Sequence, residues 1–269
     1  MSNAAPVKLV AGATDFLVRH RDILDSETFL IDCTAVPEMQ GVFVDESEGA
    51  LCIGAAATFT EIAADSRVRT HATALAEAAA SVGSVQIRNR ATLGGNVANA
   101  SPAADSLPAL ACLGAICLVT DSAGRVKHLP VLDLIAGFEK NTLTGDEFIQ
   151  EFQIPIQPER ITGFLKLGSR EHVSISRINM AISIYLREGN ASELTAWVGT
   201  LGSRPVSISV EGIVKSKEMA AAFKQRLAAL VDVKIAGRYS QVYKRSAVQG
   251  LGESLFMRLT GEASGGEIR

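Results

Sequence analysis

Short apolar runs alternate with small or polar residues over the first fifty positions, as they do where strands and helices follow each other closely. The expected elements are a strand at 7–10, a turn at 11–13, a helix at 16–21 and a strand at 29–33. Thr14 or Asp15 can cap the helix, because a side-chain oxygen there accepts a main-chain N–H. The pattern therefore predicts a small β-α-β unit.

The next part of the chain predicts a strand at 51–54 and an alanine-rich helix at 72–82. Thr58 and Glu61 have the spacing of a capping box. From 83 to 102 neither a helical nor a strand period persists, so an irregular loop is expected, and long loops of this kind are usually functional. We expect the loop to end in a helix capped by Ser101, with Pro102 at its first position.

The second half of the chain predicts strands followed by helices, which is an α+β pattern. Apolar residues at 178, 180, 182, 184 and 186 have the period of two that is typical of a strand. Prolines mark a boundary at 155–158, and the tail at 261–266 is expected to be disordered. The other expected elements are strands at 115–120, 147–154 and 194–201 and helices at 217–231 and 239–259.

Composition narrows the class of protein. The 269 residues are 47% hydrophobic and 20% charged, with a formal net charge of −3 and 5% aromatic residues. These values indicate a globular protein without the basic surface or stacking aromatics of a nucleic-acid binder. The longest apolar stretch, 108–119, is too short to span a bilayer. No basic segment followed by an apolar one opens the chain, so we expect a cytoplasmic protein.

Common catalytic and metal-binding motifs are absent from the sequence. The four cysteines, at 33, 52, 112 and 117, have neither zinc-ligand nor iron–sulfur spacing and are expected to be small buried residues in a reducing compartment. The four histidines are scattered and are interpreted as surface or capping residues. No dinucleotide fingerprint, P-loop, metalloprotease motif or nucleophile elbow is present.

Two glycine-containing turns remain as candidate sites. The turn from Leu9 to Phe16 would expose main-chain N–H groups that attract an anion such as pyrophosphate. The alternative is a strand–helix turn that needs Gly12 for its dihedral angles. The turn at 92–97 has paired glycines that let a ligand approach the main chain, with Thr92 and Asn96 as polar groups. Its alternative is a tight turn or bulge.

Four flanking residues could assist ligand binding. Arg88 and Arg90 could offset phosphate charge, although most arginines are simply solvated. Ser101 and Asp105 could bind a ligand, but a serine cap and an acidic residue in an early helical turn are both common structural features.

Several segments in order resemble one family. The sequence is similar to the FAD-binding subunit of the molybdenum hydroxylases, which include the xanthine dehydrogenase and carbon monoxide dehydrogenase medium subunits. The resemblance covers nearly the whole chain. The segments that carry it are 11–15, 86–89, 92–96, 100–105, 145–149, 164–171, 201–205 and 238–245.

This resemblance implies an α+β fold. A vanillyl-alcohol-oxidase-like (PCMH-type) FAD-binding domain would occupy 1–158, with subdomains of about 1–45 and 46–158. A smaller α+β domain with an antiparallel sheet and helices would occupy 159–269.

The resemblance also implies a set of cofactor-binding residues. The first turn would surround the FAD pyrophosphate, and the second would lie along the cofactor. Ile149 would pack near the flavin, and Lys166, or alternatively Leu165, would approach from the second domain. The implied set is Leu9, Val10, Ala11, Gly12, Ala13, Thr14, Asp15, Phe16, Arg88, Thr92, Gly94, Gly95, Asn96, Ser101, Asp105, Ile149 and Lys166.

The sequence departs from the family at two points. Ala13 stands where the family usually has a second glycine, and its methyl group would be tolerated at negative φ but would crowd the phosphate otherwise. The family also carries a further strand and helix before the first turn. Either the first subdomain is truncated here, or a partner or a wrongly assigned start accounts for the difference.

The function implied by the resemblance is electron transfer. FAD would be bound non-covalently, the molybdenum cofactor and 2Fe–2S clusters would lie on a large and a small partner subunit, and a final acceptor such as NAD would receive the electrons. One alternative is a non-catalytic assembly scaffold that has lost FAD. Another, a free-standing flavin reductase or oxidase, lacks a substrate-specific acid or base in the sequence. The substrate would be chosen by the large partner.

Overall fold

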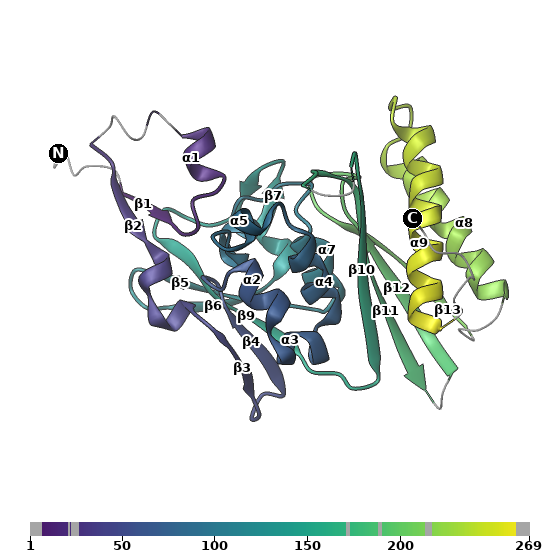
Figure 1. Ribbon diagram of the computed structural model, residues 1–269, viewed down its shortest axis with the longest axis horizontal. Helices are drawn as coiled ribbons and strands as arrows, with labels where there is room; N and C mark the ends of the chain where they lie inside the picture. Colours follow the sequence, from purple (N-terminus) through teal and green to yellow (C-terminus); the bar gives the residue numbers. More distant parts are fainter. Residues whose placement is uncertain are drawn as a thin grey trace.

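The computed structural model describes residues 7–20, 22, 27–170, 173–187, 190–212 and 217–261. Its elements form successive layers along the long axis (Figure 1). A small N-terminal unit lies at one end, followed by a five-stranded sheet, a group of short helices, a four-stranded sheet and two long helices at the other end. No helix in these ranges is long and apolar enough to cross a membrane.

The N-terminal unit has the predicted β-α-β order. Strand β1 (Val7–Val10) pairs in parallel with β2 (Phe29–Asp32), and α1 (Phe16–Arg19) lies in the connection. The helix is shorter than expected: His20 is its C-cap, and position 21 lies outside the described residues. Two 3-10 turns, η2 (Cys33–Ala35) and η3 (Pro37–Met39), lead to the first sheet.

The five-stranded sheet is antiparallel, in the order β3-β4-β9-β5-β6. The strands predicted near 51–54, 115–120 and 147–154 are confirmed, whereas β3 and β6 were not expected. The bounds are β3 (Val42–Asp45), β4 (Ala50–Gly54), β5 (Ile116–Asp121), β6 (Val126–Pro130) and β9 (Glu147–Pro155). After β6 come η4 (Val131–Leu134) and a small hairpin, β7 (Ile135–Gly137) with β8 (Lys140–Asn141).

Six short helices lie between the two large sheets (Figure 1). The predicted capping box is confirmed, since Thr58 and Glu61 bond reciprocally at the start of α2. The predicted alanine-rich helix is α4. The bounds are α2 (Phe59–Ala64), α3 (Ser66–His71), α4 (Thr73–Ser81), α5 (Val85–Arg88), α6 (Leu93–Ala98) and α7 (Ser106–Cys112).

The expectation of an irregular loop over 83–102 is wrong, because α5 and α6 occupy most of it. Each begins at a side-chain cap: Ser84 Oγ accepts from Ile87 N, and Thr92 Oγ1 accepts from Gly95 N. The helix expected at Ser101 and Pro102 is also wrong. Ala100 has a φ of +50°, which interrupts the helical run after α6. The next helix, α7, therefore begins only at Ser106.

The second sheet is antiparallel in chain order, β10-β11-β12-β13. The predicted period of two is confirmed in β11: Ile178, Met180, Ile182 and Ile184 point into a core shared with α8 and α9. The strand expected at 194–201 ends earlier, at Val198. The bounds are β10 (Arg160–Gly168), β11 (Ser176–Arg187), β12 (Asn190–Val198), β13 (Val206–Glu211), α8 (Lys217–Lys234) and α9 (Gln241–Thr260).

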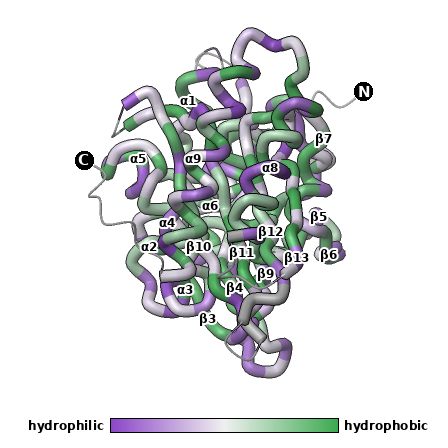
Figure 2. The backbone as a smooth tube through the Cα atoms, turned by 90° about the vertical axis from the view of Figure 1, so that its right-hand side faces the viewer, coloured by the Kyte–Doolittle hydropathy of each residue, from purple (hydrophilic) through white to green (hydrophobic). Residues whose placement is uncertain are grey.

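Two hydrophobic cores hold these layers together. The first lies among the five-stranded sheet and the short helices, and the second lies between β10–β13 and the two long helices. Figure 2 shows hydrophobic residues along strands of both sheets and hydrophilic residues in loops and at positions along the helices. All four cysteines are buried and free, as expected. Burial raises the pKa of the Cys117 thiol to about 12, which makes it unreactive.

Two expectations stay untested. The division of the chain near residue 158 falls between β9 and β10, but the domain boundaries remain a prediction. The tail expected to be disordered lies outside the described residues, apart from Gly261, which ends α9 in a left-handed conformation.

Candidate functional site

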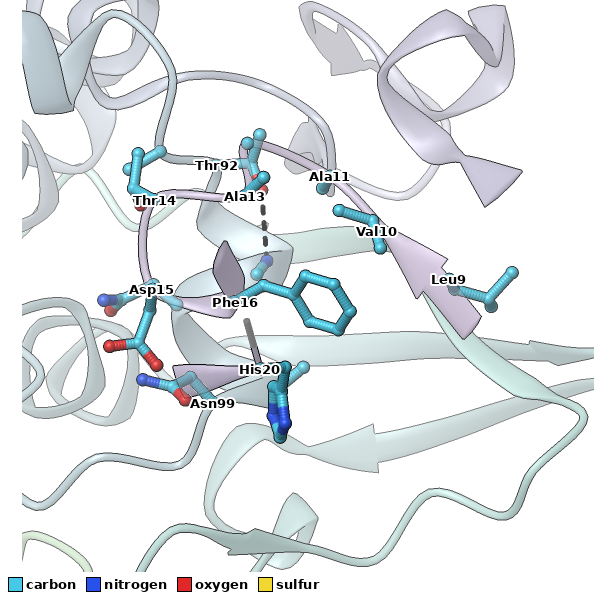
Figure 3. A pocket seen from close by; sticks show the side chains of 15 residues that line it. Leu9, Val10, Ala11, Ala13, Thr14, Asp15, Phe16, His20, Thr92 and Asn99 are labelled. Carbon is cyan, nitrogen blue, oxygen red and sulfur yellow. Dashed lines mark hydrogen bonds between the residues drawn. The ribbon is translucent and has the colours of Figure 1, made fainter. Parts of the chain in front are cut away.

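A cavity of about 240 Å³ lies between the turn after β1 and the helix α6 (Figure 3). It brings together most of the two turns singled out in the sequence, although some 80 residues separate them. Its lining is Leu9, Val10, Ala11, Gly12, Ala13, Thr14, Asp15, Phe16, His20, Ala91, Thr92, Gly95, Asn96, Ala98 and Asn99.

The first turn offers its main chain to the cavity. Among the described residues, the main-chain N–H groups of 12–16 find no hydrogen-bond acceptor. Unpaired amides in a row form a site for oxyanions, because each can donate to a negatively charged oxygen. Ala13 has a φ of +59°, the left-handed conformation that a glycine adopts without cost.

Close backbone packing holds the two turns together. A Cβ atom added to Gly12 would lie 1.9 Å from the main-chain oxygen of Arg90, which no side chain could tolerate. Gly12 therefore lets the first turn lie directly on the segment before α6. The expectation that the turn needs Gly12 for its dihedral angles is wrong, since its φ is not in the left-handed region; the glycine is required for close approach instead.

The second turn forms the start of α6, and it lines the cavity with glycines and polar side chains. Its amides are already bonded: Leu93 N donates to Ala57 O at 3.0 Å and Gly94 N to Ala55 O at 2.8 Å. A Cβ on Gly94 would collide with Ala55, whereas one on Gly95 would meet only the Thr92 hydroxyl, at 2.9 Å. Gly95 therefore leaves cavity space that a larger side chain would fill.

A smaller, more apolar cavity of about 190 Å³ adjoins the first. Both are lined by Leu9, Val10, Ala11, Gly95 and Ala98, so they meet along the end of β1 and one face of α6. Gly94 and Ile149, two members of the implied cofactor-binding set, line this second cavity. Its other lining residues are Cys33, Met39, Ala55, Leu143, Glu147 and Phe148. The site thus passes from a polar turn into an apolar recess.

An ion-pair network links the first turn to the β7–β8 hairpin. Arg19 of α1 donates to both carboxylate oxygens of Glu139, at 2.6 and 2.9 Å, and its Nε lies 2.7 Å from Asp15. Glu139 belongs to the β7–β8 hairpin and Asp15 to the first turn. The two carboxylates raise the pKa of Arg19, and Arg19 lowers the pKa of Glu139. The network fixes the turn against the rest of the fold.

Other residues expected at the site lie elsewhere. Arg88 donates to the main-chain oxygens of Val82 and Gly83, and Ser101 Oγ accepts from the N–H of Ala103. Neither lines the two cavities.

Asp105 is also outside these cavities, in a buried polar cluster between α7 and the second sheet. It accepts from Lys166 Nζ at 2.8 Å, Ser176 Oγ at 2.6 Å and Asn179 Nδ2 at 2.8 Å. Lys166 points toward α7, while its neighbour Leu165 packs on the second core. Any contact of this cluster with a cofactor stays a prediction.

Four residues that line the first cavity were missed: His20, Ala91, Ala98 and Asn99. His20 and Asn99 each cap the C-terminal end of a short helix, α1 and α6 respectively. The His20 ring lies 5.1 Å from that of Phe16, four residues earlier on the same helix (Figure 3). That spacing is the only sequence signal that could have placed His20. The described residues contain no cluster of three or more His, Cys, Asp or Glu able to hold a metal ion.

Comparisons with known proteins agree on one family. A family model for the FAD binding domain in molybdopterin dehydrogenase matches residues 1–157. The xanthine dehydrogenase FAD-binding subunit of Escherichia coli O157:H7 is 34% identical over 201 residues, which cover 74% of this chain and 68% of that protein. The nicotinate dehydrogenase FAD-subunit of Eubacterium barkeri is 29% identical over 275 residues, 97% of this chain and 90% of the relative.

Solved structures with the same fold are more distant in sequence. Reconstituted CO dehydrogenase from Oligotropha carboxidovorans has a TM-score of 0.82 and 17% identity, covering 96% of this chain and 91% of that one. Quinoline 2-oxidoreductase from Pseudomonas putida 86 has a TM-score of 0.77 and 20% identity, with 96% and 90% covered. The fold class predicted from the sequence is therefore confirmed.

Proposed function

Because the chain belongs to the family of FAD-binding domains of molybdopterin dehydrogenases, we propose that it is the electron-transfer flavoprotein subunit of a molybdenum hydroxylase. In this proposal a large partner subunit carries the molybdenum cofactor and oxidises the substrate. A small partner carries 2Fe–2S clusters and passes electrons to this chain. The complex is cytoplasmic, and a final acceptor such as NAD receives the electrons.

One observation carries the assignment of the cofactor site. Residues 12–16, whose amides have no acceptor among the described residues, line a cavity bounded by the glycine-containing start of α6. A diphosphate suits this arrangement, because its oxygens accept several hydrogen bonds at once. The one carboxylate in the lining of this cavity, that of Asp15, is paired with Arg19, which it shares with Glu139. The residues present therefore fit a dinucleotide.

The proposed roles of the residues follow from their chemistry. The first turn holds the diphosphate through its amides, and Thr92 and Asn96 orient the polar groups beside it. Gly94 and Ile149 border an apolar recess that keeps water away from the ring system. When bound, FAD supplies the ability to accept electrons singly or in pairs, while the protein binds and positions it.

A second role is proposed for the Asp105 cluster. Lys166 is almost buried and is paired with Asp105, so this segment of β10 presents a fixed charge and not a mobile one. In the proposal, Asp105 hydrogen-bonds to the cofactor and Lys166 approaches it from the second domain. We further propose domains at 1–158 and 159–269, with the cofactor held mainly by the first.

A competing function rests on Ala13. A methyl group at a left-handed position beside the proposed diphosphate could weaken FAD binding. This would favour a scaffold that assembles the complex without carrying electrons. The two functions differ in flavin content and in electron transfer from the assembled complex to an artificial acceptor.

The test is the flavin content of the purified protein. Denaturation should release FAD without proteolysis, recognised by its absorbance and mass, at about one per chain. Gly95→Val should abolish retention, because the added side chain fills the cavity. Gly145→Val is the matched control, since a Cβ at this exposed glycine meets nothing within 4 Å.

Both variants should remain folded, as judged by circular dichroism. Stoichiometric FAD in Gly95→Val would assign this turn a structural role only. A colourless wild-type protein that cannot be reconstituted with FAD would contradict the electron-transfer function and favour the scaffold.

A further inference from the structure

A separate cavity of about 690 Å³ lies between the edges of the two large sheets. One wall comes from the end of β6, η4 and the turn between α7 and β5. The other comes from β12, the segment that leads into β13 and the end of α8. The cavity shares no lining residue with either cavity of the cofactor site. Its volume lies in the range of small-molecule sites, about 300–1,000 Å³.

Two prolines keep this gap between the sheets open. β6 and β13 are edge strands, and edge strands can pair with each other through their free N–H and C=O groups. Pro130 is the last residue of β6, and Pro205 directly precedes β13. Neither has an N–H to donate, so each removes a donor that a ladder across the gap would use. The opening is therefore a defined part of the fold.

Trp197, the one tryptophan of the sequence, forms part of the wall. It alternates along β12 with Ala196 and Val198, which lie in the second core, so its indole lies on the opposite face of the sheet. There it is half-buried and packs on the first core. Ser207, its partner across β12 and β13, lines the cavity beside it. The cavity thus offers an aromatic surface with a hydroxyl group next to it.

Two exposed cations of the lining are unpaired. Arg204 precedes β13 and Lys234 ends α8, and within the described ranges neither forms an ion pair or a side-chain hydrogen bond. Asp133 of η4 is the one carboxylate of the lining, and it has no ion-pair partner in that part of the chain either. Two positive charges and one negative charge give the lining a net charge of +1. An anionic group would therefore meet two donors that no protein acceptor occupies.

We propose that this cavity binds a small aromatic carboxylate. The indole and the two prolines offer flat apolar surface to an aromatic ring. Arg204 and Lys234 offer charge-assisted hydrogen bonds to a carboxylate. A single carboxylate matches the net charge of the lining, whereas a polyphosphate would bring excess negative charge close to Asp133. The inference goes beyond the proposed function, and it does not rest on bound flavin.

A ligand in this position would connect the two halves of the molecule. On one side, η4 packs on the first core and continues directly into the β7–β8 hairpin, which carries Glu139. On the other side, Trp197 belongs to the four-stranded sheet. A ligand that contacts both walls binds only the arrangement in which the sheets have this spacing. It should therefore stabilise the folded chain by mass action.

The experiment is titration of the full chain with phenylacetate, followed by the fluorescence of Trp197. Because the chain has one tryptophan, its emission reports on this cavity, and the phenyl ring does not absorb where tryptophan is excited selectively. We expect a saturable change in emission at millimolar or lower concentration. Phenylacetamide lacks the negative charge and cyclohexylacetate lacks the aromatic ring, so each should bind several-fold more weakly.

Charge-removing variants locate the binding site. Arg204→Gln and Lys234→Gln should each weaken phenylacetate binding several-fold while the circular dichroism of the chain stays unchanged. Lys224→Gln is the matched control, because it removes the same charge from the same helix as Lys234→Gln, but Lys224 pairs with Glu253 and does not line the cavity. It should leave the affinity unchanged. An equal loss of affinity in Lys224→Gln and Lys234→Gln would overturn the proposal, since only the overall charge of the chain would then matter.

Other outcomes also decide against the proposal. Neither an emission change nor heat of binding at millimolar phenylacetate would overturn it outright. Equal affinity for phenylacetamide would exclude a carboxylate site, and equal affinity for cyclohexylacetate would exclude the aromatic class. The titration is repeated on the complex in which the chain co-purifies, where the affinity should be the same. Loss of binding there would show that a partner subunit covers the cavity, which would overturn a small-molecule site.

Flavin absorbance of the same samples separates this test from that of the proposed function. Phenylacetate binding that depends on Lys234, in a chain that cannot hold FAD, would support this site and contradict the flavin proposal. FAD at about one per chain without phenylacetate binding would do the reverse.

Discussion

Ala13 has a left-handed backbone conformation, which is unfavourable for a residue with a side chain. Its φ of +59° brings the methyl group too close to the following carbonyl, at a cost of about 1–2 kcal/mol. The surrounding contacts maintain this conformation: Gly12 packs on the main chain of Arg90, and Leu17 N donates to Ala13 O at 3.2 Å. The turn is therefore held by its neighbours and not by its own preference.

Ala13→Gly should stabilise the protein and strengthen FAD binding. The relief of strain exceeds the added chain entropy of glycine, about 0.4–1 kcal/mol, and leaves a net gain on the order of 0.5 kcal/mol. Removing the methyl group also frees space beside the proposed diphosphate, so the FAD dissociation constant should fall. Urea unfolding and titration with FAD measure the two effects.

Ala11→Gly is the control for this prediction. Ala11 lies in the same turn and lines the same cavity, but its φ is not positive. Glycine there relieves no strain and should lower the free energy of unfolding. Equal changes in the two variants would show that the conformation of residue 13 does not limit cofactor binding.

Residues that line the main cavity could be identified from the sequence when they lie close together along the chain. Leu9 to Phe16 and Thr92 to Asn96 form compact turns, so their glycines and small residues were visible as motifs. His20 and Asn99 were missed because the ends of two helices meet only after folding. Asp105 was expected along the cofactor, but residues more than 60 positions later surround it, which no local pattern could show.

At the scale of elements, the N-terminal unit is weakly supported by its own structure. Two parallel strands alone are marginally stable, and apolar side chains on both are exposed, with Val7 at 55% and Phe29 at 66%. Its position over the cavity depends on the contact of Gly12 with Arg90 and on the ion pair between Arg19 and Glu139. These contacts set the width of the site.

Arg19→Ala should raise the FAD dissociation constant several-fold without unfolding the protein. The substitution separates α1 from the β7–β8 hairpin and frees the Asp15 carboxylate, which then repels the diphosphate. Titration of the apoprotein with FAD measures the effect. Arg125→Ala is the control, because Arg125 pairs with Asp121 in a hairpin outside the cavity lining. An equal change in both variants would contradict a specific role for Arg19.

The pH dependence of this difference provides a second check. Arg19 lowers the pKa of Glu139 from its usual 4.5, so the ion pair contributes fully above that value and is lost as the pH falls through the lowered pKa. The effect of Arg19→Ala on FAD affinity should therefore be constant from pH 8 down to about pH 5. A difference that disappears already at pH 6 would exclude this ion pair as its cause.

Elements with a strong internal pattern could be predicted, and those defined by pairing could not. The alternation in β11 and the helical stretches that form α8 and α9 were predicted from the sequence. By contrast, α6 contains two adjacent glycines, which disfavour a helix. It forms because Thr92 caps it and Ala55 and Ala57 accept its first amides. Such tertiary bonds override local preference.

At the scale of the molecule, two hydrophobic cores are joined by polar contacts, of which the Asp105 cluster is buried. Glu77 of α4 accepts from Phe164 N of β10 and from Arg258 of α9, both at 2.6 Å. Asp105 accepts from three donors in β10 and β11. Polar bonds between cores give a fixed relative orientation, since each requires a defined geometry. They also transmit unfolding of one core to the other.

Asp105→Ala should lower the free energy of unfolding by about 3 kcal/mol, because it leaves the nearly buried Lys166 without its counter-charge. The lost hydrogen bonds join the two hydrophobic cores. We therefore expect a single unfolding transition in the wild type and two in the variant, with the second core unfolding separately from the first. Scanning calorimetry measures both features. Asp121→Ala is the matched control: Asp121 is also buried, but its bonds to Ala123 and Arg125 lie within one hairpin. It should destabilise the protein while keeping one transition. If both variants still unfold in a single step, the two cores are coupled through their apolar contacts, and the polar cluster serves the site alone.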